Sequence, residues 1–415
     1  MKLSPQPRFL LYSSFRDYLR ILYDITTNQT EKGEYCLKLE EWIKGAYATQ
    51  YALCMPQARV GIYLTIKSIT QKKKNIILSP YTIIDVVNMV ICAGATPIFC
   101  DINEETCNIN PQKAEKLIDS NTAAIMVTHL HGLAAEILKF KAICQEHDIL
   151  LIEDAAQAFG AKINDRHAGT IGDIGIFSFG RYKHVSSLFG GMLVTNQKSL
   201  HTKISNQYAK FTKTSKSKLI KRCLELLIKD LLTKTFLFQL VLFPFIRISE
   251  KYDIIFLKRI FGSENDLTKK EKIPSSYLER MSESQAKMAI NQLVQVKANN
   301  LKRIENAQIY YQALKKNSTI KLPPMRDDLS HIYTYYPVQV SDRECLIRYL
   351  ISSNRDASIQ HYKNCADLVI FEKYYRECPI ARKVSHSTIL LPTYPRYRIT
   401  EIEKTCNEIL KFVNE

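Results

Sequence analysis

Seven short apolar runs alternate with helix-length amphipathic segments in the first half of the sequence, and this alternation restricts the fold more than any other feature. The runs are YALCM (51–55), NIILS (75–79), TPIFCDI (96–102), AAIMVTH (123–129), ILLIED (149–154), IGIFSF (174–179) and MLVTN (192–196). Between them lie segments such as VVNMVICAG and AEILKFKAICQEH, in which apolar residues recur at spacings of three and four. This βαβ pattern predicts an α/β fold with a mostly parallel, seven-stranded sheet that has helices on both faces. Ligands of such sheets bind beyond the carboxyl ends of the strands.

The character of the sequence changes after residue 200, which predicts three units. Residues 1–200 form an N-terminal segment and the large domain, and residues 275–415, with a long helix near their start, form a smaller α+β domain. Residues 201–274 are a basic and apolar helical insert. Its helix has one apolar face: Leu219, Ile220, Cys223, Leu224, Leu227, Leu231 and Leu232. The following run 236–246 is too short to span a membrane, so the insert either packs in a core or interface or lies on a membrane surface.

The composition narrows the classes of partner. Hydrophobic residues make up 46% and charged residues 24% of the 415 residues, so neither disorder nor a fibrous repeat is indicated. Lysine and arginine number 58 against 41 acidic residues, which favours anionic partners such as phosphorylated ligands, nucleic acid or an acidic membrane. No basic stripe interleaved with aromatic residues is present, so nucleic acid is not expected.

Cysteine and histidine patterns give no support for a metal site or for disulfides. The eleven cysteines form no CxxC pair, and the sequence HLH at 129–131 has no third ligand nearby. The N-terminal segment has no long apolar region and no small-residue cleavage site. We therefore expect no metal and a reducing, cytoplasmic location.

Two residues at strand ends suggest chemistry. Lys183 lies in the glycine-rich turn of FSFGRYKHVSSLFGGMLVTN. It is either an ordinary surface lysine or a lysine whose amine takes part in the chemistry of the protein. Asp154 ends a buried run, where it either caps the next helix or faces a ligand together with Gln157, one helical turn later. The sequence contains no G-x-G-x-x-G, P-loop or G-x-S-x-G motif, which would indicate dinucleotide, nucleotide or acyl chemistry. A lysine and an acid suggest a Schiff-base cofactor whose pyridine nitrogen is kept protonated.

The motifs in this region carry a family resemblance. The order IEDAAQAFGA, then GDIGIFSF, then three residues, then Lys183 and GGMLVTN resembles the DegT/DnrJ/EryC1/StrS family of pyridoxal-phosphate sugar aminotransferases. Upstream, KLEEWIKGAYATQYALCMPQARVGIYLTI, SPYTIIDVVNMVICAGATPIFCDI and VTHLHG are similar to the family's earlier motifs, so the match runs in order from about 38 to 200. The resemblance implies a fold-type-I aminotransferase with pyridoxal 5'-phosphate (PLP) as cofactor.

The resemblance also implies roles for individual residues. Lys183 would hold the cofactor covalently and move the proton, and Asp154 would pair with the ring nitrogen. Gln157 would face the ring hydroxyl, and Ser178 would bind the phosphate.

Three positions differ from the family's usual residues. Ala58 and Arg59 stand where the family has Gly-Thr or Gly-Arg, so the charge of Arg59 is expected to contact the phosphate. Ile83 occupies the position that stacks on the cofactor and is often aromatic. Leu278 corresponds to an asparagine that the family donates across its dimer.

The function implied is amination of a nucleotide-linked keto-sugar for surface polysaccharide or lipopolysaccharide synthesis. Glutamate is the expected amino donor, and a homodimer with peripheral contact to the inner membrane face is expected. Two alternatives stay open. Family members with histidine in place of the lysine are sugar dehydratases, and here His184 follows Lys183 directly. The chain could also be a catalytically silent, membrane-associated scaffold with the same fold.

Overall fold

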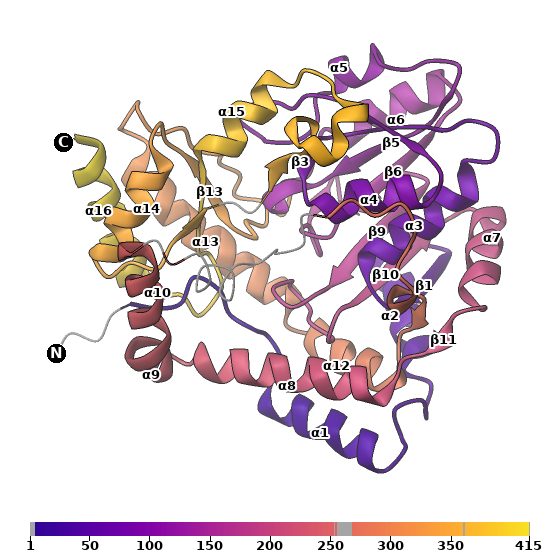
Figure 1. Ribbon diagram of the computed structural model, residues 1–415, viewed down its shortest axis with the longest axis horizontal. Coiled ribbons are helices and arrows are strands. Elements are labelled where there is room, and N and C mark those ends of the chain that lie inside the picture. Colours follow the sequence, from indigo (N-terminus) through magenta and orange to yellow (C-terminus); the bar gives the residue numbers. More distant parts are fainter. Residues whose placement is uncertain (1–4, 253, 255–267, 360–361, 415) are drawn as a thin grey trace.

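A seven-stranded sheet forms the centre of the large domain in the computed structural model, which describes residues 5–252, 254, 268–359 and 362–414 (Figure 1). In spatial order its strands are β1 (Tyr51–Met55), β10 (Gly190–Thr195), β9 (Ile174–Phe179), β6 (Leu150–Asp154), β5 (Thr122–Thr128), β2 (Asn75–Leu78) and β4 (Thr96–Phe99). From β9 across the sheet to β4, each pair of neighbouring strands is parallel. Strand β10 is antiparallel to both of its neighbours, β1 and β9. The predicted fold class and all seven predicted strands are confirmed, with small shifts at the strand ends.

Helices cover both faces because alternate side chains of each strand point to opposite sides. Ile76 and Leu78 pack in the same buried cluster as α3 (Ala58–Ile69), α4 (Ile84–Cys92) and α7 (Lys198–Tyr208). Ile77, between them, packs on the other face with α6 (Ile137–Glu146) and α5 (Pro111–Glu115). That second face is continued by α2 (Tyr35–Tyr47) and α12 (Glu283–Leu293), which pack over β1, β9 and β10.

The smaller domain is built on an antiparallel three-stranded sheet in the order β13 (Tyr336–Gln339), β16 (Thr388–Leu391), β14 (Ser358–Ile359). It packs with α13 (Val296–Leu314), α14 (Arg343–Ser352) and α16 (Ile399–Asn414). The expected single long helix after residue 275 is divided into α12 and α13. The break lies where the chain leaves the large-domain core, since α12 packs on α2 and α13 packs on α16.

Several short elements connect these layers. They are β3 (Tyr81–Thr82), β7 (Lys162–Ile163), β8 (Arg166–His167), β11 (Thr212–Lys213), β12 (Glu279–Arg280), β15 (Lys363–Asn364) and α15 (Pro379–Ser387). Strand β15 pairs with β3, so the smaller domain is joined to the large domain close to the ends of the central strands.

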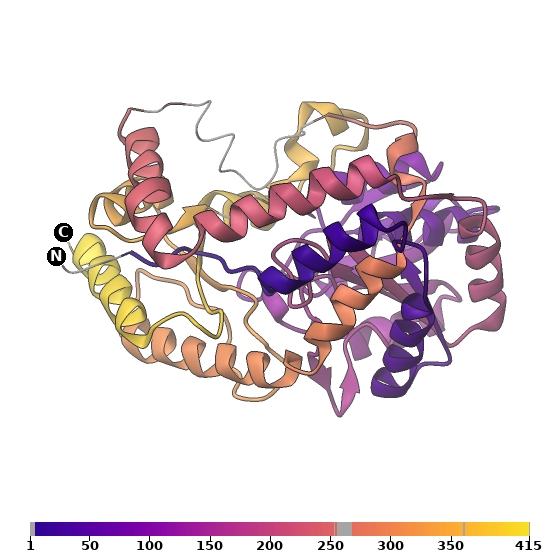
Figure 2. The ribbon, with the colours of Figure 1, turned by 90° about the horizontal axis from the view of Figure 1, so that it is seen from below.

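The insert packs on both domains. Its first helix, α8 (Lys216–Leu232), lies beside α1 (Phe15–Thr26) and is followed by α9 (Thr235–Leu237), a π-helical turn (Phe238–Leu242) and α10 (Phe243–Lys251) (Figure 2). Phe238, Phe243 and Ile246 are buried in the core of the smaller domain. Residues 255–267 of the predicted insert lie outside the described residues, and the predicted division into three units stays a prediction.

The predicted apolar face of α8 is only partly correct. Leu219 and Cys223 are buried against α1 as that pattern requires, and Leu226 joins them. Ile220, Leu224 and Leu231 are instead exposed, because α1 covers only one side of the helix. Among the described residues no single helix is long and apolar enough to cross a membrane; only the pair Lys216–Leu232 and Thr235–Lys251, bent by 75°, reaches that length and composition together.

Candidate active site

A cavity of about 1000 Å³ lies at the carboxyl ends of the parallel strands. Thr128, Asp154 and Ser178, at or near the ends of β5, β6 and β9, all line it. The cavity brings together every residue that the sequence predicted for the site: Ala58, Arg59, Ile83, Asp154, Gln157, Ser178 and Lys183. Ten basic and four acidic side chains line it, so it favours an anionic ligand.

Asp154 is the last residue of β6 and is 4% exposed. Its Oδ1 accepts a hydrogen bond of 3.1 Å from the N–H of Ala156. Burial raises the pKa of the carboxyl group, while the Ala156 N–H and then the charge of Lys183 act in the opposite direction. A cationic group bound beside Asp154 would hold it ionised, and a protonated ring nitrogen is such a group.

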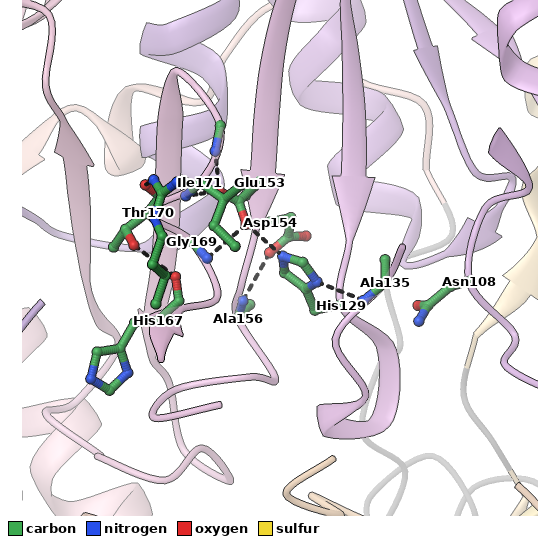
Figure 3. Close-up of polar contacts among 12 residues, drawn as sticks. Asn108, His129, Ala135, Glu153, Asp154, Ala156, His167, Gly169, Thr170 and Ile171 are labelled. Carbon is green, nitrogen blue, oxygen red and sulfur yellow. Dashed lines mark hydrogen bonds and ion pairs between the residues drawn. The ribbon is translucent and has the colours of Figure 1, made fainter. Parts of the chain in front are cut away.

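Glu153, one residue earlier, has a structural role on the opposite side of the strand (Figure 3). Its carboxylate is fully buried and accepts hydrogen bonds from the N–H groups of Gly169 (2.8 Å) and Ile171 (2.7 Å). It also lies 2.9 Å from Nε2 of His129, whose Nδ1 accepts the N–H of Ala135 (3.0 Å). Both ring nitrogens of His129 therefore have structural partners.

Both histidines of the HLH sequence are buried. His129 bonds Glu153, and the ring of His131 is buried, which lowers the pKa of His131 to about 3. The part of the chain that the structure describes contains no group of three or more histidine, cysteine, aspartate or glutamate side chains placed to hold a metal ion.

The beginning of α3, with Ser178 beside it, is a candidate cradle for a phosphate group. This helix has no side-chain cap at Gln57, and N–H groups in the first turn of a helix have no carbonyl partner within it and attract anions. Ser178 stands opposite Gly191 in the β9–β10 pairing, and a Cβ atom on Gly191 would lie 2.8 Å from the nitrogen of Ala58. Gly191 therefore allows α3 to approach the strand that carries Ser178.

Arg59 lines the cavity, but its guanidinium group is already paired. It bonds Asp85, which also accepts from Lys270 Nζ (2.7 Å) and from the hydroxyl of Tyr277 (3.2 Å). The charge of Arg59 is thus partly matched by Asp85, so a contact with the phosphate by charge stays a prediction.

Gln157 and Ile83 lie on the cavity wall in settings that suit a flat ring. The amide oxygen of Gln157 accepts the backbone N–H of His131 (2.9 Å), which leaves the amide nitrogen as the group that can donate to a ligand. Ile83 directly precedes α4 and is half-buried. The lysine, the buried acid, the phosphate cradle and this wall together fit PLP.

His184 points away from the cavity. It is buried, and its Nε2 lies 3.3 Å from the hydroxyl of Thr334. Burial lowers the pKa of His184 well below its usual value, and the charges of Arg303 and Lys183 lower it further. His184 is not among the residues that line the cavity.

Comparison with known proteins identifies the family. The model of the DegT/DnrJ/EryC1/StrS aminotransferase family matches residues 19–222 and 247–410. The chain belongs to this family. It is a PLP-dependent sugar aminotransferase.

Relatives and solved structures agree with this assignment. The aminotransferase is 32% identical to the GDP-perosamine synthase of Escherichia coli O157:H7 over 48% of this chain and 55% of that protein. It is 25% identical to the dTDP-3-amino-3,6-dideoxy-alpha-D-galactopyranose transaminase of Aneurinibacillus thermoaerophilus, over 81% and 78% of the two chains.

The structural likeness extends over nearly the whole chain. Helicobacter pylori PseC, an aminotransferase involved in the biosynthesis of pseudoaminic acid, aligns with a TM-score of 0.75 at 20% identity, covering 98% of this chain and 99% of its own. A GDP-4-keto-6-deoxymannose-3-dehydratase aligns with a TM-score of 0.75 at 17% identity, covering 97% and 100%. At such identity the likeness concerns the fold, and aminotransferases and dehydratases share it.

The sequence reasoning missed the contribution of α8 to the cavity. Lys218, Lys221, Arg222, Glu225 and Lys229 all line it. Their spacing of three and four residues places them on one side of a helix, and this signal was present in the sequence. Leu278 is not among the lining residues, whereas its neighbour Tyr277 is.

Proposed function

We propose that the aminotransferase transfers the amino group of glutamate to a nucleotide-linked keto-sugar, and that the amino sugar enters surface polysaccharide or lipopolysaccharide. One observation carries the proposal: Lys183, the buried Asp154 and a phosphate cradle line one cavity that also has a large excess of basic side chains. The relatives named for GDP- and dTDP-linked sugars support a nucleotide carrier. A solved relative with a trapped PLP-glutamate geminal diamine supports glutamate as the donor.

The residues divide the work as follows. When bound, PLP supplies a conjugated ring that accepts electrons from the substrate carbon. Asp154 and Gln157 both line the cavity. The carboxylate of Asp154 would keep the nitrogen of the cofactor ring protonated. The amide of Gln157 would donate a hydrogen bond to the hydroxyl group of the cofactor ring and so orient it. The amine of Lys183 would take a proton from the substrate carbon that bears nitrogen and deliver a proton to the carbon on the other side of that nitrogen, a 1,3 shift. Ser178 and the first turn of α3 hold the phosphate and so fix the ring relative to Lys183.

Transamination is favoured over dehydration by the position of His184. The dehydratase alternative needs a histidine in place of the cofactor lysine, but His184 faces Thr334 and does not line the cavity. Lys183 occupies the cavity wall instead. The scaffold alternative is weakened because Lys183, Asp154, Gln157 and Ser178 are all present in one cavity.

We propose two further properties of the same enzyme. The family resemblance supports a homodimer, which light scattering of the purified protein would detect. The outer surface of the insert supports peripheral contact with an anionic membrane on the cytoplasmic side, because Leu224, Ile228 and Phe245 are 43%, 55% and 48% exposed and the chain carries an excess of basic residues. Replacing these three residues by serine should release the protein from anionic vesicles; a parent protein that fails to float with such vesicles contradicts membrane contact.

The activity is tested by the visible spectrum of the PLP-loaded protein. Glutamate alone, without the keto-sugar, should replace the absorption band of the lysine-bound cofactor by that of the amine form, because this is the first half of the reaction. Glutamine serves as the control donor. A spectrum that stays unchanged with glutamate contradicts glutamate as donor, and a protein that develops no visible band with PLP contradicts the proposed reaction.

A further inference from the structure

Helix α8 presents three sides with different chemistry. Leu219, Cys223 and Leu226 are buried against α1, which fixes the orientation of the helix. Leu224 and Ile228 face solvent. The third side lines the active-site cavity with Lys218, Lys221, Arg222, Glu225 and Lys229. The insert is thus a wall of the active site, and this wall is mainly cationic.

Some of the cations on this wall have carboxylate partners. Glu225 bonds both Arg181 Nη1 (2.7 Å) and Lys229 Nζ (3.0 Å), so that one carboxylate serves two cations. Lys218 bonds Glu279 (2.6 Å). These pairs leave a net positive charge on the wall even before the remaining side chains are considered.

Within the described part of the chain, neither Lys221 nor Arg222 forms a direct ion pair with a carboxylate, although the charges of Glu279 and Glu225 act on Arg222. The Cζ atom of Arg222 lies 4.9 Å from the ring centroid of Phe189, and that of Arg181 lies 4.5 Å from the same ring. Phe189 has a φ of +81°, which is uncommon for a residue with a side chain and indicates a constrained turn. The ring of Phe189 therefore gathers two guanidinium groups beside the cavity.

The setting of Arg222 suits the binding of an anion. It is half-buried, and burial lowers its pKa; Glu279 opposes this shift, while the charges of Arg181 and Arg59 add to it. A guanidinium group that is partly removed from water and surrounded by other cations is stabilised when an anion binds between them. A guanidinium group can donate two parallel hydrogen bonds to two oxygens of one phosphate, which fixes the orientation of the phosphate as well as adding affinity.

We propose that Lys221 and Arg222 of α8, together with Arg181, bind the diphosphate group of the sugar substrate, so that the insert supplies this subsite within the same chain. The inference rests on the proposed function, in which the cofactor phosphate occupies the α3 and Ser178 cradle. Because the cofactor phosphate would be held by that cradle, the basic residues of α8 stay available to bind a second anion. A diphosphate is an anion that joins a sugar either to a nucleotide or to a polyprenyl lipid. The exposed apolar side of the same helix makes the lipid carrier worth testing beside the nucleotide.

The test measures the binding of diphosphates to the PLP-loaded protein by calorimetry. The probes are inorganic pyrophosphate, GDP, dTDP and farnesyl diphosphate. The variant Lys221→Ala/Arg222→Ala should bind the best of these probes at least about tenfold more weakly than the parent, because charge-assisted hydrogen bonds are lost. Binding to the parent should also weaken as salt is added.

Matched variants control for charge and for folding. Lys203→Ala/Lys216→Ala removes two positive charges from exposed residues outside the cavity, one of them on α8, and should bind like the parent. Arg222→Lys keeps the charge but loses the fork of the guanidinium group, so its affinity should lie between those of the parent and the double alanine variant. Melting temperature and the visible cofactor band report the fold and the PLP site of each variant.

The outcomes separate the two proposals. Equal affinity of the parent and the Lys221→Ala/Arg222→Ala variant, or no diphosphate binding by the parent, overturns the subsite. Absence of the visible cofactor band in the parent overturns the proposed function but leaves the calorimetry readable. Tighter, Arg222-dependent binding of GDP or dTDP supports the subsite with a nucleotide carrier, and tighter, Arg222-dependent binding of farnesyl diphosphate supports it with a lipid carrier.

Discussion

Replacing Glu153 by glutamine should destabilise the large domain, although the new side chain has almost the same shape. The two carboxylate oxygens accept four donors: the N–H groups of Gly169, Ile171 and Gly172, and Nε2–H of His129. The His129 ring is fixed as a donor toward Glu153, because its other nitrogen accepts the N–H of Ala135. In either orientation, the glutamine amide would therefore direct its NH₂ group at two buried donors.

The expected cost follows from these unsatisfied donors. Each buried donor without an acceptor costs about 1–3 kcal/mol, so the loss of acceptors for two donors should lower the free energy of unfolding by about 2–6 kcal/mol. Trp42 in α2 is the single tryptophan and reports unfolding of the large domain by fluorescence. With a urea dependence of about 3 kcal/mol per M, the midpoint should fall by roughly 1–2 M. Glu146→Gln, at an exposed site in α6, is the control. Equal midpoints for the two variants would show that the four donors do not depend on the Glu153 carboxylate for stability.

The same residue predicts a pH dependence. Burial raises the pKa of Glu153, but the hydrogen bond from His129 and those from the N–H groups of Gly172 and Gly169 outweigh burial, so that the pKa lies below its usual value. A lowered pKa gives stability that is present above the unfolded-state value, about 4.3, and is lost as the pH falls through the folded-state value. The urea midpoint of the parent should therefore decrease as the pH is lowered below about 4.3. The Glu153→Gln variant should lack the part of this decrease that comes from protonation of Glu153.

Two further substitutions test the site and the sheet. Asp154→Asn should keep the melting temperature close to that of the parent but slow the half-reaction with glutamate by orders of magnitude in stopped-flow absorbance, because a neutral amide does not hold the ring nitrogen protonated; a near-parental rate would make Asp154 a capping residue. Gly175→Ala should abolish soluble folded protein, because its Cβ would overlap the carbonyl oxygen of Gly169. Gly45→Ala, in α2 with no atom within 4 Å of the new methyl group, should express normally and melt no lower than the parent.

The sheet and the cavity residues could be predicted because both depend on local patterns. Apolar runs of strand length fixed where the seven strands lie, and parallel strands bring their carboxyl ends to one edge, so Asp154 and Ser178 had to meet. The different roles of Glu153 and Asp154 also follow from a local rule, since successive strand residues point to opposite faces.

The role of the insert could not be predicted in the same way. Whether Leu224 is buried or exposed depends on which side of α8 meets α1, and that contact joins segments about 200 residues apart in the sequence. The basic residues of α8 looked like the border of a membrane-binding face, but packing of Leu219 and Leu226 on α1 turns Lys221 and Arg222 toward the cavity. The break between α12 and α13 likewise depends on the two cores that these helices join.

The most direct test of the account identifies the lysine that holds the cofactor. The PLP-loaded protein is reduced with borohydride, digested, and mapped by mass spectrometry before and after treatment with glutamate. We expect a reduced cofactor adduct on Lys183 alone, and we expect this adduct to be lost when glutamate has first converted the cofactor to the free amine form. An adduct on another lysine of the parent protein, or an adduct of unchanged amount in the Lys183→Ala variant, would rule out this cavity as the active site.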